Sequence, residues 1–170
     1  MAPLTGPFGG HIDQVGIIVP DLACAAEAYA GAIGASFQVF EVDETLGFFS
    51  GSSPQFRIRF AVGLAELLTI ELIQPVSGVT LYSKFLEERG PGIHHLGIYV
   101  PDLTSASAAL AGSGCQPILT GEIAALGKFA YFDCPAMHCT LEALELASTF
   151  PLFLMSHAAP LRSRSRETGA

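Results

Sequence analysis

The pattern of hydrophobic and polar positions in this chain repeats one motif. Residues 15–22 read VGIIVPDL, and residues 96–103, which lie 81 positions further on, read LGIYVPDL. In both copies a short apolar run ends at Pro-Asp, which is typical of a strand that leads into a turn. An alanine-rich stretch follows each time, and the aspartate is a favourable residue to begin a helix. The repeat therefore predicts a duplicated βα module.

Further alternating and apolar runs extend the pattern in both halves. We expect strands at 15–19, 37–42, 55–62, 67–73, 93–100, 116–120, 128–133 and 140–146. We expect helices at 23–32, 80–89 and 103–112. The stretch 43–54 is rich in glycine and serine and is expected to be a loop.

This element order predicts an α+β fold. Each half would form a βαβββ module, and the two tandem modules would build a U-shaped, open mixed β-sheet with the helices outside. The concave face of such a sheet is a natural ligand site. The expected segments are an N-terminal extension at 1–10, a first module at 11–79, a connecting helix at 80–91, a second module at 92–148, and a tail at 149–170 that we expect to be partly disordered.

Composition narrows the functional classes. Half of the 170 residues are hydrophobic and 14% are charged, which is typical of a compact globular protein. The net charge of −8 argues against nucleic acid as a partner. We find no signal peptide and no apolar run of membrane-spanning length, so we expect a cytoplasmic protein without a membrane partner.

The cysteines lack a metal-finger spacing and are expected to be reduced packing residues. They are Cys24, Cys115, Cys134 and Cys139.

Four polar residues take related positions on the predicted strands. Gln14 and His95 begin the first strand of each module, and Glu71 and Glu142 lie in the last. A carboxylate among leucine and isoleucine either faces water in the hollow of the sheet or, if buried, must be paired or bound to a metal. One imidazole, two carboxylates and an amide oxygen suit a divalent ion such as Mn, Co, Ni, Mg or Zn. The alternative is that the glutamates are solvated strand residues and His95 is a packed histidine.

These residues and their surroundings resemble the vicinal oxygen chelate superfamily of glyoxalases, bleomycin-resistance proteins and extradiol dioxygenases. The resemblance covers roughly residues 11–147, and its most similar branch is methylmalonyl-CoA epimerase-like. It rests on the paired strand openings and on the sequences IELIQP at 70–75, FLEERGPGIHH at 85–95 and LE at 141–142. It implies a divalent metal held by one residue from each of four strands. Those residues are here Gln14, Glu71, His95 and Glu142.

The chain departs from that branch in two ways. The usual first ligand is histidine, and the glutamine oxygen at this position is a weaker donor, which should lower metal affinity. The branch also has a glutamate on the third strand of the first module, where this chain has Arg57-Ile58-Arg59. Arg57 and Arg59 either grip a substrate carboxylate or CoA phosphate or form an exposed charged face. The remaining candidates for the catalytic base are Glu142 and Glu71.

Three further residues bear on the site. We expect His11 to point away from it. His94 is also expected to face away and to pack or hydrogen-bond at a module or subunit contact. Tyr131 is a candidate for substrate binding.

The leading functional hypothesis is a lyase or isomerase of the glyoxalase or epimerase type. It would use a divalent metal to assist enolisation and proton transfer on a small carbonyl or acyl-CoA substrate, and it would act as a homodimer. A metal-free binding or sequestration protein of the bleomycin-resistance type is the alternative, and a metal-independent isomerase is a third reading. The loops at 43–54 and 120–127 are expected to set substrate specificity.

Overall fold

The computed structural model describes residues 11–148, apart from 66–67 and 125. The predicted N-terminal extension and C-terminal tail lie outside the described residues. In chain order the elements are β1 (Gln14–Ile18), α1 (Leu22–Ile33), β2 (Ser36–Asp43), β3 (Gly47–Phe49), β4 (Arg57–Ala65), β5 (Leu68–Ser77), α2 (Leu81–Arg89), β6 (Gly92–Tyr99), α3 (Leu103–Gly112), β7 (Gln116–Ile123), β8 (Gly127–Cys134), the short 3₁₀ helix η1 (Pro135–Met137) and β9 (Cys139–Leu146).

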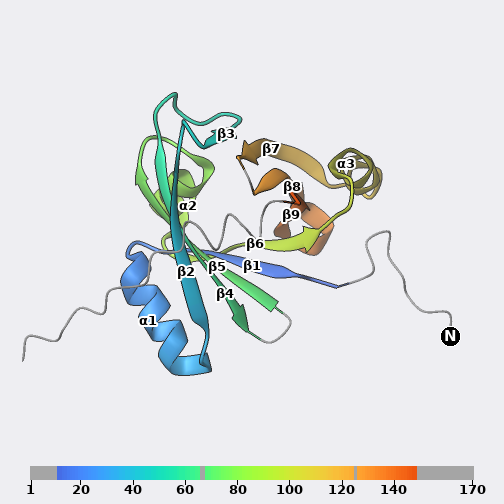
Figure 1. The fold of residues 1–170 in the computed structure, drawn as a ribbon. Helices are drawn as coiled ribbons and strands as arrows, with labels where there is room; N and C mark the ends of the chain where they lie inside the picture. Colours follow the sequence, from blue (N-terminus) through green and yellow to red (C-terminus); the bar gives the residue numbers. More distant parts are fainter. Residues whose placement is uncertain (1–10, 66–67, 125, 149–170) are drawn as a thin grey trace, which may run out of the picture.

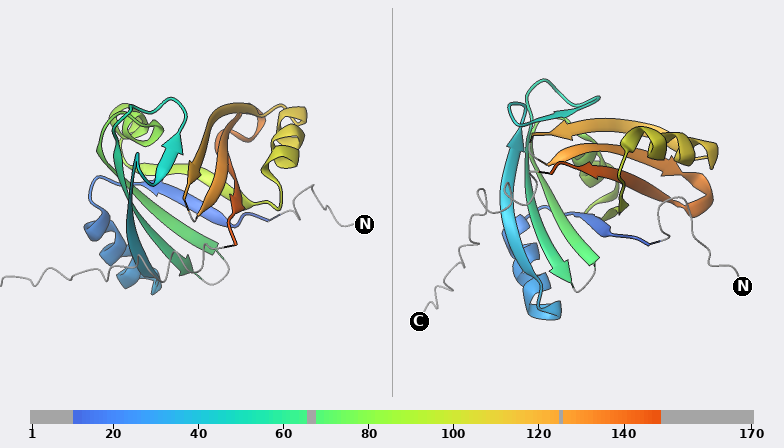
Figure 2. Two further views of the ribbon diagram at one scale, coloured as in Figure 1. Left: turned by 45° about the horizontal axis from the view of Figure 1, so that its top comes forward. Right: turned by 45° about the vertical axis from the view of Figure 1, so that its right-hand side comes forward.

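The strands form one mixed sheet that curves until it is nearly closed (Figure 1). Its order is β2-β4-β5-β1-β6-β9-β8-β7-β3. β1 is parallel to β5, β6 is parallel to β9, and β1 and β6 meet antiparallel at the centre. Helices α1 and α3 lie on the outside of the curve (Figure 2). The expected mixed sheet with outer helices is confirmed, and its division into two tandem modules stays a prediction.

Both repeated Pro-Asp turns begin helices, as the sequence predicts. The Asp21 side chain accepts a hydrogen bond from the backbone N–H of Cys24, and Asp102 accepts one from Ser105. These bonds satisfy amide groups that have no partner within the first helical turn. Gly34, with φ of 72°, follows the last residue of α1 in the left-handed conformation that glycine adopts without strain.

The two segments expected to be specificity loops contain strand. Residues 47–49 form β3, which pairs antiparallel with β7 and brings the two ends of the sheet together. Phe49 anchors this strand because its side chain is buried among other aromatic rings. β7 in turn extends to Ile123, a buried residue paired with Gly47. The loop expectation was therefore wrong for 47–49 and 120–123, whereas 44–46 and 50–54 contain no strand, as expected.

The interior of the curved sheet is filled mainly by aromatic and aliphatic side chains. Helix α2 contributes Tyr82 to this core, and the Tyr82 hydroxyl lies 2.9 Å from that of Tyr131 on β8. Two separate apolar clusters lie on the outer face, one under α1 and one under α3. The interior cluster includes Phe40, Phe49, Phe56, Phe60, Tyr82, Phe129 and Tyr131.

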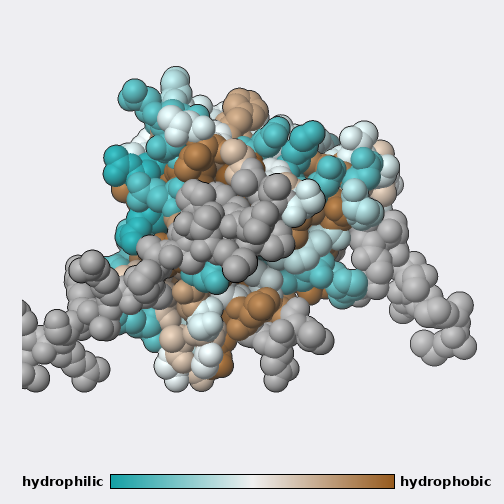
Figure 3. Space-filling model, viewed as in Figure 1, coloured by the Kyte–Doolittle hydropathy of each residue, from teal (hydrophilic) through white to brown (hydrophobic). Residues whose placement is uncertain are grey.

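The outer surface gives no sign of a membrane helix. None of the helices in the described part of the chain is long and apolar enough to cross a membrane. On the face drawn in Figure 3, hydrophilic residues cover much of the visible upper surface, and hydrophobic residues show as smaller patches.

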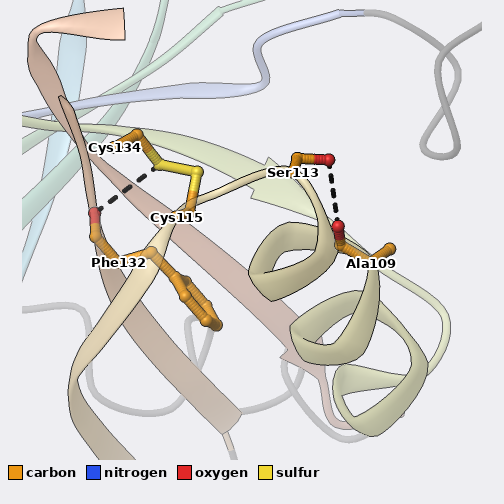
Figure 4. The surroundings of a disulfide bond; sticks show 5 residues. All are labelled: Ala109, Ser113, Cys115, Phe132 and Cys134. Carbon is orange, nitrogen blue, oxygen red and sulfur yellow. Dashed lines mark hydrogen bonds between the residues drawn. A yellow bond between two sulfur atoms is a disulfide. The ribbon is translucent and has the colours of Figure 1, made fainter. Parts of the chain in front are cut away.

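Two of the four cysteines form a disulfide, which corrects the expectation that all are reduced. Cys115 precedes β7 and Cys134 ends β8, and their sulfur atoms are bonded beneath α3 (Figure 4). Both residues are buried in the outer cluster that α3 covers. The pair continues the antiparallel register of β7 and β8, in which Gln116 lies opposite Asp133, and the sequence analysis did not consider how these two strands pair. Cys24 and Cys139 are free thiols.

We predict that the Cys115–Cys134 bond stabilises the fold. The two residues are 19 positions apart, and closing a loop of this size in the unfolded chain is worth about 3 kcal/mol. Cys115→Ala/Cys134→Ala should lower the free energy of unfolding in urea by about that amount. Cys24→Ala, at an exposed free thiol, is the control. Equal stability of the double variant and wild type under oxidising conditions would contradict the prediction.

Candidate metal centre

The four predicted site residues come from the four central strands and converge inside the sheet. In the β1–β5 pair Gly16 lies opposite Glu71, and in the β6–β9 pair Gly97 lies opposite Glu142. The two halves thus present their glutamates in the same register. Gln14, Glu71, His95 and Glu142 are each at most 8% exposed.

Their polar atoms lie close together. His95 Nε2 is 3.0 Å from Glu142 Oε2 and 3.6 Å from Glu71 Oε2. Gln14 Nε2 donates hydrogen bonds to the same two carboxylate oxygens, at 3.1 Å to Glu71 and 3.3 Å to Glu142. It also lies 3.4 Å from His95 Nε2. The alternative of solvated strand glutamates is therefore wrong, because both carboxyl groups are buried and face one centre.

Two glycines make room for this convergence. Gly16 is paired with His95 across β1 and β6, and a Cβ atom at Gly16 would lie 1.9 Å from Cε1 of the His95 ring. Gly97 is paired with Gln14, and a Cβ atom there would lie 2.8 Å from Cβ of Gln14. The repeated glycine of the VGI and LGI motifs thus leaves space for the polar side chain of the opposite strand.

A β-bulge corrects the expected orientation of His94. The β1–β6 register passes from Gly16 opposite His95 to Ile17 opposite Ile93, so His94 is the extra residue. A bulge breaks the alternation of side chains, and His94 consequently turns to the same side as His95. The Nδ1 atoms of the two rings are 3.0 Å apart.

His94 packs under α2 and supports the neighbouring ring. Its ring makes edge-on contacts with Tyr82, Phe85 and Tyr131. Burial, together with the nearby His95 and Arg89, lowers the pKa of His94 to about 3, so that it is neutral at physiological pH. A neutral His94 can accept the Nδ1–H of His95, which leaves Nε2 of His95 free to act as a ligand.

The electrostatics of the site favour a bound cation. Burial, and then the charge of Glu142, raise the pKa of Glu71 well above its ordinary value. Burial and the same carboxylate also raise the pKa values of Tyr131 and Tyr82, so that both phenols stay protonated. Two carboxyl groups in a low-dielectric interior need a compensating positive charge, and a divalent ion supplies one.

The donor set fits such an ion. One ligand atom each of Glu71, His95 and Glu142 lies within 4.8 Å of the others. Nitrogen and oxygen donors of this kind suit first-row divalent metals or magnesium. Gln14 lies beside these three donors with its NH₂ group toward the carboxylates, and the role of all four residues as ligands stays a prediction.

Comparison with known proteins identifies the family of the chain. A family model described as glyoxalase/bleomycin resistance protein/dioxygenase superfamily matches residues 13–132. The chain belongs to this superfamily. An ethylmalonyl-CoA/methylmalonyl-CoA epimerase from Cereibacter sphaeroides is 30% identical over 129 residues, covering 74% of this chain and 89% of the relative.

Solved structures of two methylmalonyl-CoA epimerases share the fold. Methylmalonyl-CoA epimerase from Mycobacterium tuberculosis is 26% identical with a TM-score of 0.65, over 83% of this chain and 91% of that one. A variant of the Streptomyces coelicolor methylmalonyl-CoA epimerase, in complex with 2-nitronate-propionyl-CoA, is 19% identical with a TM-score of 0.64. That match covers 81% of this chain and 95% of the other, and it supports the fold alone.

Other predicted site residues of this superfamily member lie in different places. Tyr131 is adjacent to the centre, with its ring 5.0 Å from that of His95. Arg57 and Arg59 lie near Glu41 on the face of β4 opposite the buried Ile58 and Phe60, and the fold does not bring them to the four polar residues. Their role and that of Tyr131 in substrate binding stay predictions. The His11 side chain is exposed, and its Nε2 lies 3.2 Å from Asp13 Oδ1.

Sequence reasoning missed two hydroxyl groups beside Gln14. The Tyr99 hydroxyl lies 3.3 Å from Gln14 Oε1 and 3.1 Å from Thr69 Oγ1. Tyr99 and Thr69 also line a largely apolar cavity of about 350 Å³ next to the centre. The signal was present, because Thr69 lies two positions from Glu71 and Tyr99 lies four positions from His95 on the same strand, and even spacings along a strand share a face.

The glycine at position 16 provides a test of the site. Gly16→Ala should displace the enclosed ring of His95, lower the free energy of unfolding by about 1–3 kcal/mol and weaken any metal binding. Gly31→Ala is the matched control, since Gly31 is exposed on α1 with no atom within 4 Å of an added Cβ. Urea unfolding measures the stability. Equal stability of the two variants would contradict the packing of His95 against Gly16.

Proposed function

We propose that this protein is an isomerase of the epimerase type that uses a divalent metal and acts on an acyl-CoA or a related small carbonyl compound. The observation that carries the proposal is the convergence of four buried polar side chains, two of them carboxyl groups, on one centre. The similarity to the Cereibacter sphaeroides epimerase supports the acyl-CoA class of substrate. A homodimer stays a prediction.

Gln14, Glu71, His95 and Glu142 would hold the metal. When bound, a divalent ion supplies positive charge against the negative charge that develops on the substrate carbonyl oxygen as the neighbouring C–H is deprotonated. The protein contributes the donor residues and an apolar interior beside them. The aromatic core on one side of the centre excludes water, which strengthens electrostatic interactions inside it.

Glu142 and Glu71 are the groups that can move a proton. They come from β9 and β5, in opposite halves of the sheet, and so approach the centre from two sides. We assign removal of the substrate proton to Glu142 and its return from the opposite side to Glu71.

The cavity beside Tyr99 suits the organic part of a small acyl group. Its lining is mainly apolar and includes Val62, Leu64 and Leu146. A volume of about 350 Å³ is at the small end of the range for ligand pockets. An acyl group there would lie next to Gln14, because Thr69 and Tyr99 form part of the same wall.

Metal binding tests the first part of the proposal. Protein stripped with a chelator should bind one ion per chain when titrated with Mn²⁺, Co²⁺, Ni²⁺, Zn²⁺ or Mg²⁺ in a calorimeter. His95→Ala and Glu142→Gln should each weaken binding by about 100-fold or more, since each removes a ligand. Arg57→Ala, on the outer face of β4, is the control. Wild type that binds none of these ions would contradict the metal site.

Proton exchange tests the second part. With methylmalonyl-CoA in D₂O, the enzyme should incorporate deuterium at the carbon next to the thioester. Glu142→Gln and Glu71→Gln should each slow this exchange by about 10²–10⁴-fold, because each loses an acid–base group. Exchange that persists in EDTA would indicate the metal-independent isomerase. Chelator-insensitive binding of the CoA ester without exchange would indicate the sequestration protein.

A further inference from the structure

The two ends of the Gln14 side-chain amide have different hydrogen-bond partners. On its inner side, Nε2 donates to the carboxylates of Glu71 and Glu142. On its outer side, Oε1 faces the hydroxyl of Tyr99 at 3.3 Å, and that hydroxyl is 3.1 Å from Thr69 Oγ1. The amide is therefore held with its NH₂ group, not its oxygen, toward the proposed metal position.

The two hydroxyl groups are held in place by Asp13, the residue before Gln14. The backbone carbonyl of Asp13 accepts a hydrogen bond from the N–H of Thr69 at 2.8 Å. Its carboxylate Oδ2 accepts one from the N–H of Tyr99, also at 2.8 Å. Asp13 thus joins β5 and β6 on either side of β1, which fixes both hydroxyl-bearing residues against the amide.

A metal requires the opposite orientation of the amide. An amide nitrogen has no lone pair available for a cation, so Gln14 must present Oε1 inward to serve as a ligand. Turning the amide over also removes its two N–H donors from the carboxylates, which frees those oxygens for the metal. The NH₂ group then faces Tyr99.

We propose that Tyr99 and Thr69 form a hydroxyl relay that lets the Gln14 amide turn over when a divalent metal binds. With the NH₂ group inward, the Tyr99 hydroxyl donates to Gln14 Oε1. With the oxygen inward, Tyr99 accepts a hydrogen bond from Gln14 Nε2 and turns its own proton to Thr69 Oγ1. A hydroxyl both donates and accepts, so the outer side of the amide keeps a partner in either orientation.

The relay belongs to the glutamine side of the centre alone. The residue equivalent to Tyr99 in the first copy of the repeat is Ile18, which has no hydroxyl. Thr140 lies opposite His95 as Thr69 lies opposite Gln14, yet its hydroxyl makes no hydrogen bond with any of the four residues of the centre. Tyr99 and Thr69 are therefore positioning residues that act through Gln14.

The decisive variant is Thr69→Val. Valine has no hydroxyl to accept the Tyr99 proton, so this proton can be donated only to Gln14 Oε1. When Gln14 turns Oε1 toward the metal, the Tyr99 O–H donor therefore loses its partner. Thr69→Val should weaken binding of Mn²⁺ or Zn²⁺ by about tenfold in calorimetry. Thr69→Ser should bind as wild type does. Thr140→Val removes the same hydroxyl at the equivalent position and should leave the affinity within about twofold of wild type.

Repeating the Thr69→Val substitution in a Gln14→His variant separates the relay from a structural effect. In Gln14→His the imidazole needs no amide turnover, so adding Thr69→Val should change the metal affinity by less than about twofold. In wild type the Gln14 side-chain amide signals of a ¹H–¹⁵N spectrum should shift when Mg²⁺ or Zn²⁺ saturates the site. In Thr69→Val this shift should require a correspondingly higher ion concentration.

The outcomes distinguish this inference from the proposed function on which it rests. If neither wild type nor Gln14→His binds an ion, the proposed metal site is wrong. If both bind but Thr69→Val equals wild type, the relay is wrong while the metal site stands. If the loss in Thr69→Val persists in the Gln14→His background, or Thr140→Val shows the same loss, the effect is structural and the relay is overturned.

Discussion

The structure depends on the burial of two carboxyl groups at the line where β1 and β6 meet. Removing a charged carboxylate from water is costly unless donors or a cation replace the water. Here Glu71 and Glu142 face one amide and one imidazole, and the raised pKa of Glu71 reflects how incompletely those groups compensate the charge. The centre is therefore a destabilising element within the fold, and such elements are typical of functional sites.

The surrounding fold makes this burial possible. Glycines at positions 16 and 97 let the side chains of the opposite strand reach the centre. The aromatic interior, with Tyr82 from α2 and Phe49 from β3, supplies apolar burial next to the polar residues and closes the hollow around them. Stability from the core and chemistry at the centre thus come from adjacent parts of one interior face of the sheet.

Much of this arrangement was readable from the sequence. The repeat placed Gln14 and His95 at equivalent positions in the two halves, and strand alternation then favoured a common site with Glu71 and Glu142. The errors arose where alternation fails or where contacts are distant in sequence. The bulge turned His94 inward, and no residue pattern distinguishes a bulged strand from a regular one. The pairing of β3 with β7 depends on how segments distant in sequence approach one another in space, and the disulfide depends on the register of the consecutive strands β7 and β8.

The two halves support their site residues differently, although they begin from one motif. His95 is held by a neighbour on its own strand, because the bulge brings the ring of His94 to its Nδ1 atom. Gln14 has no such neighbour and is held across strands by Tyr99 and, through it, Thr69. An imidazole has one nitrogen for the site and one for its support, so a single partner fixes its role. An amide has two unlike ends that can exchange places, and only a partner able to both donate and accept leaves that exchange open. A tyrosine hydroxyl that is hydrogen-bonded to a threonine meets this requirement. An aliphatic residue such as Ile18, at the corresponding place in the other half, does not.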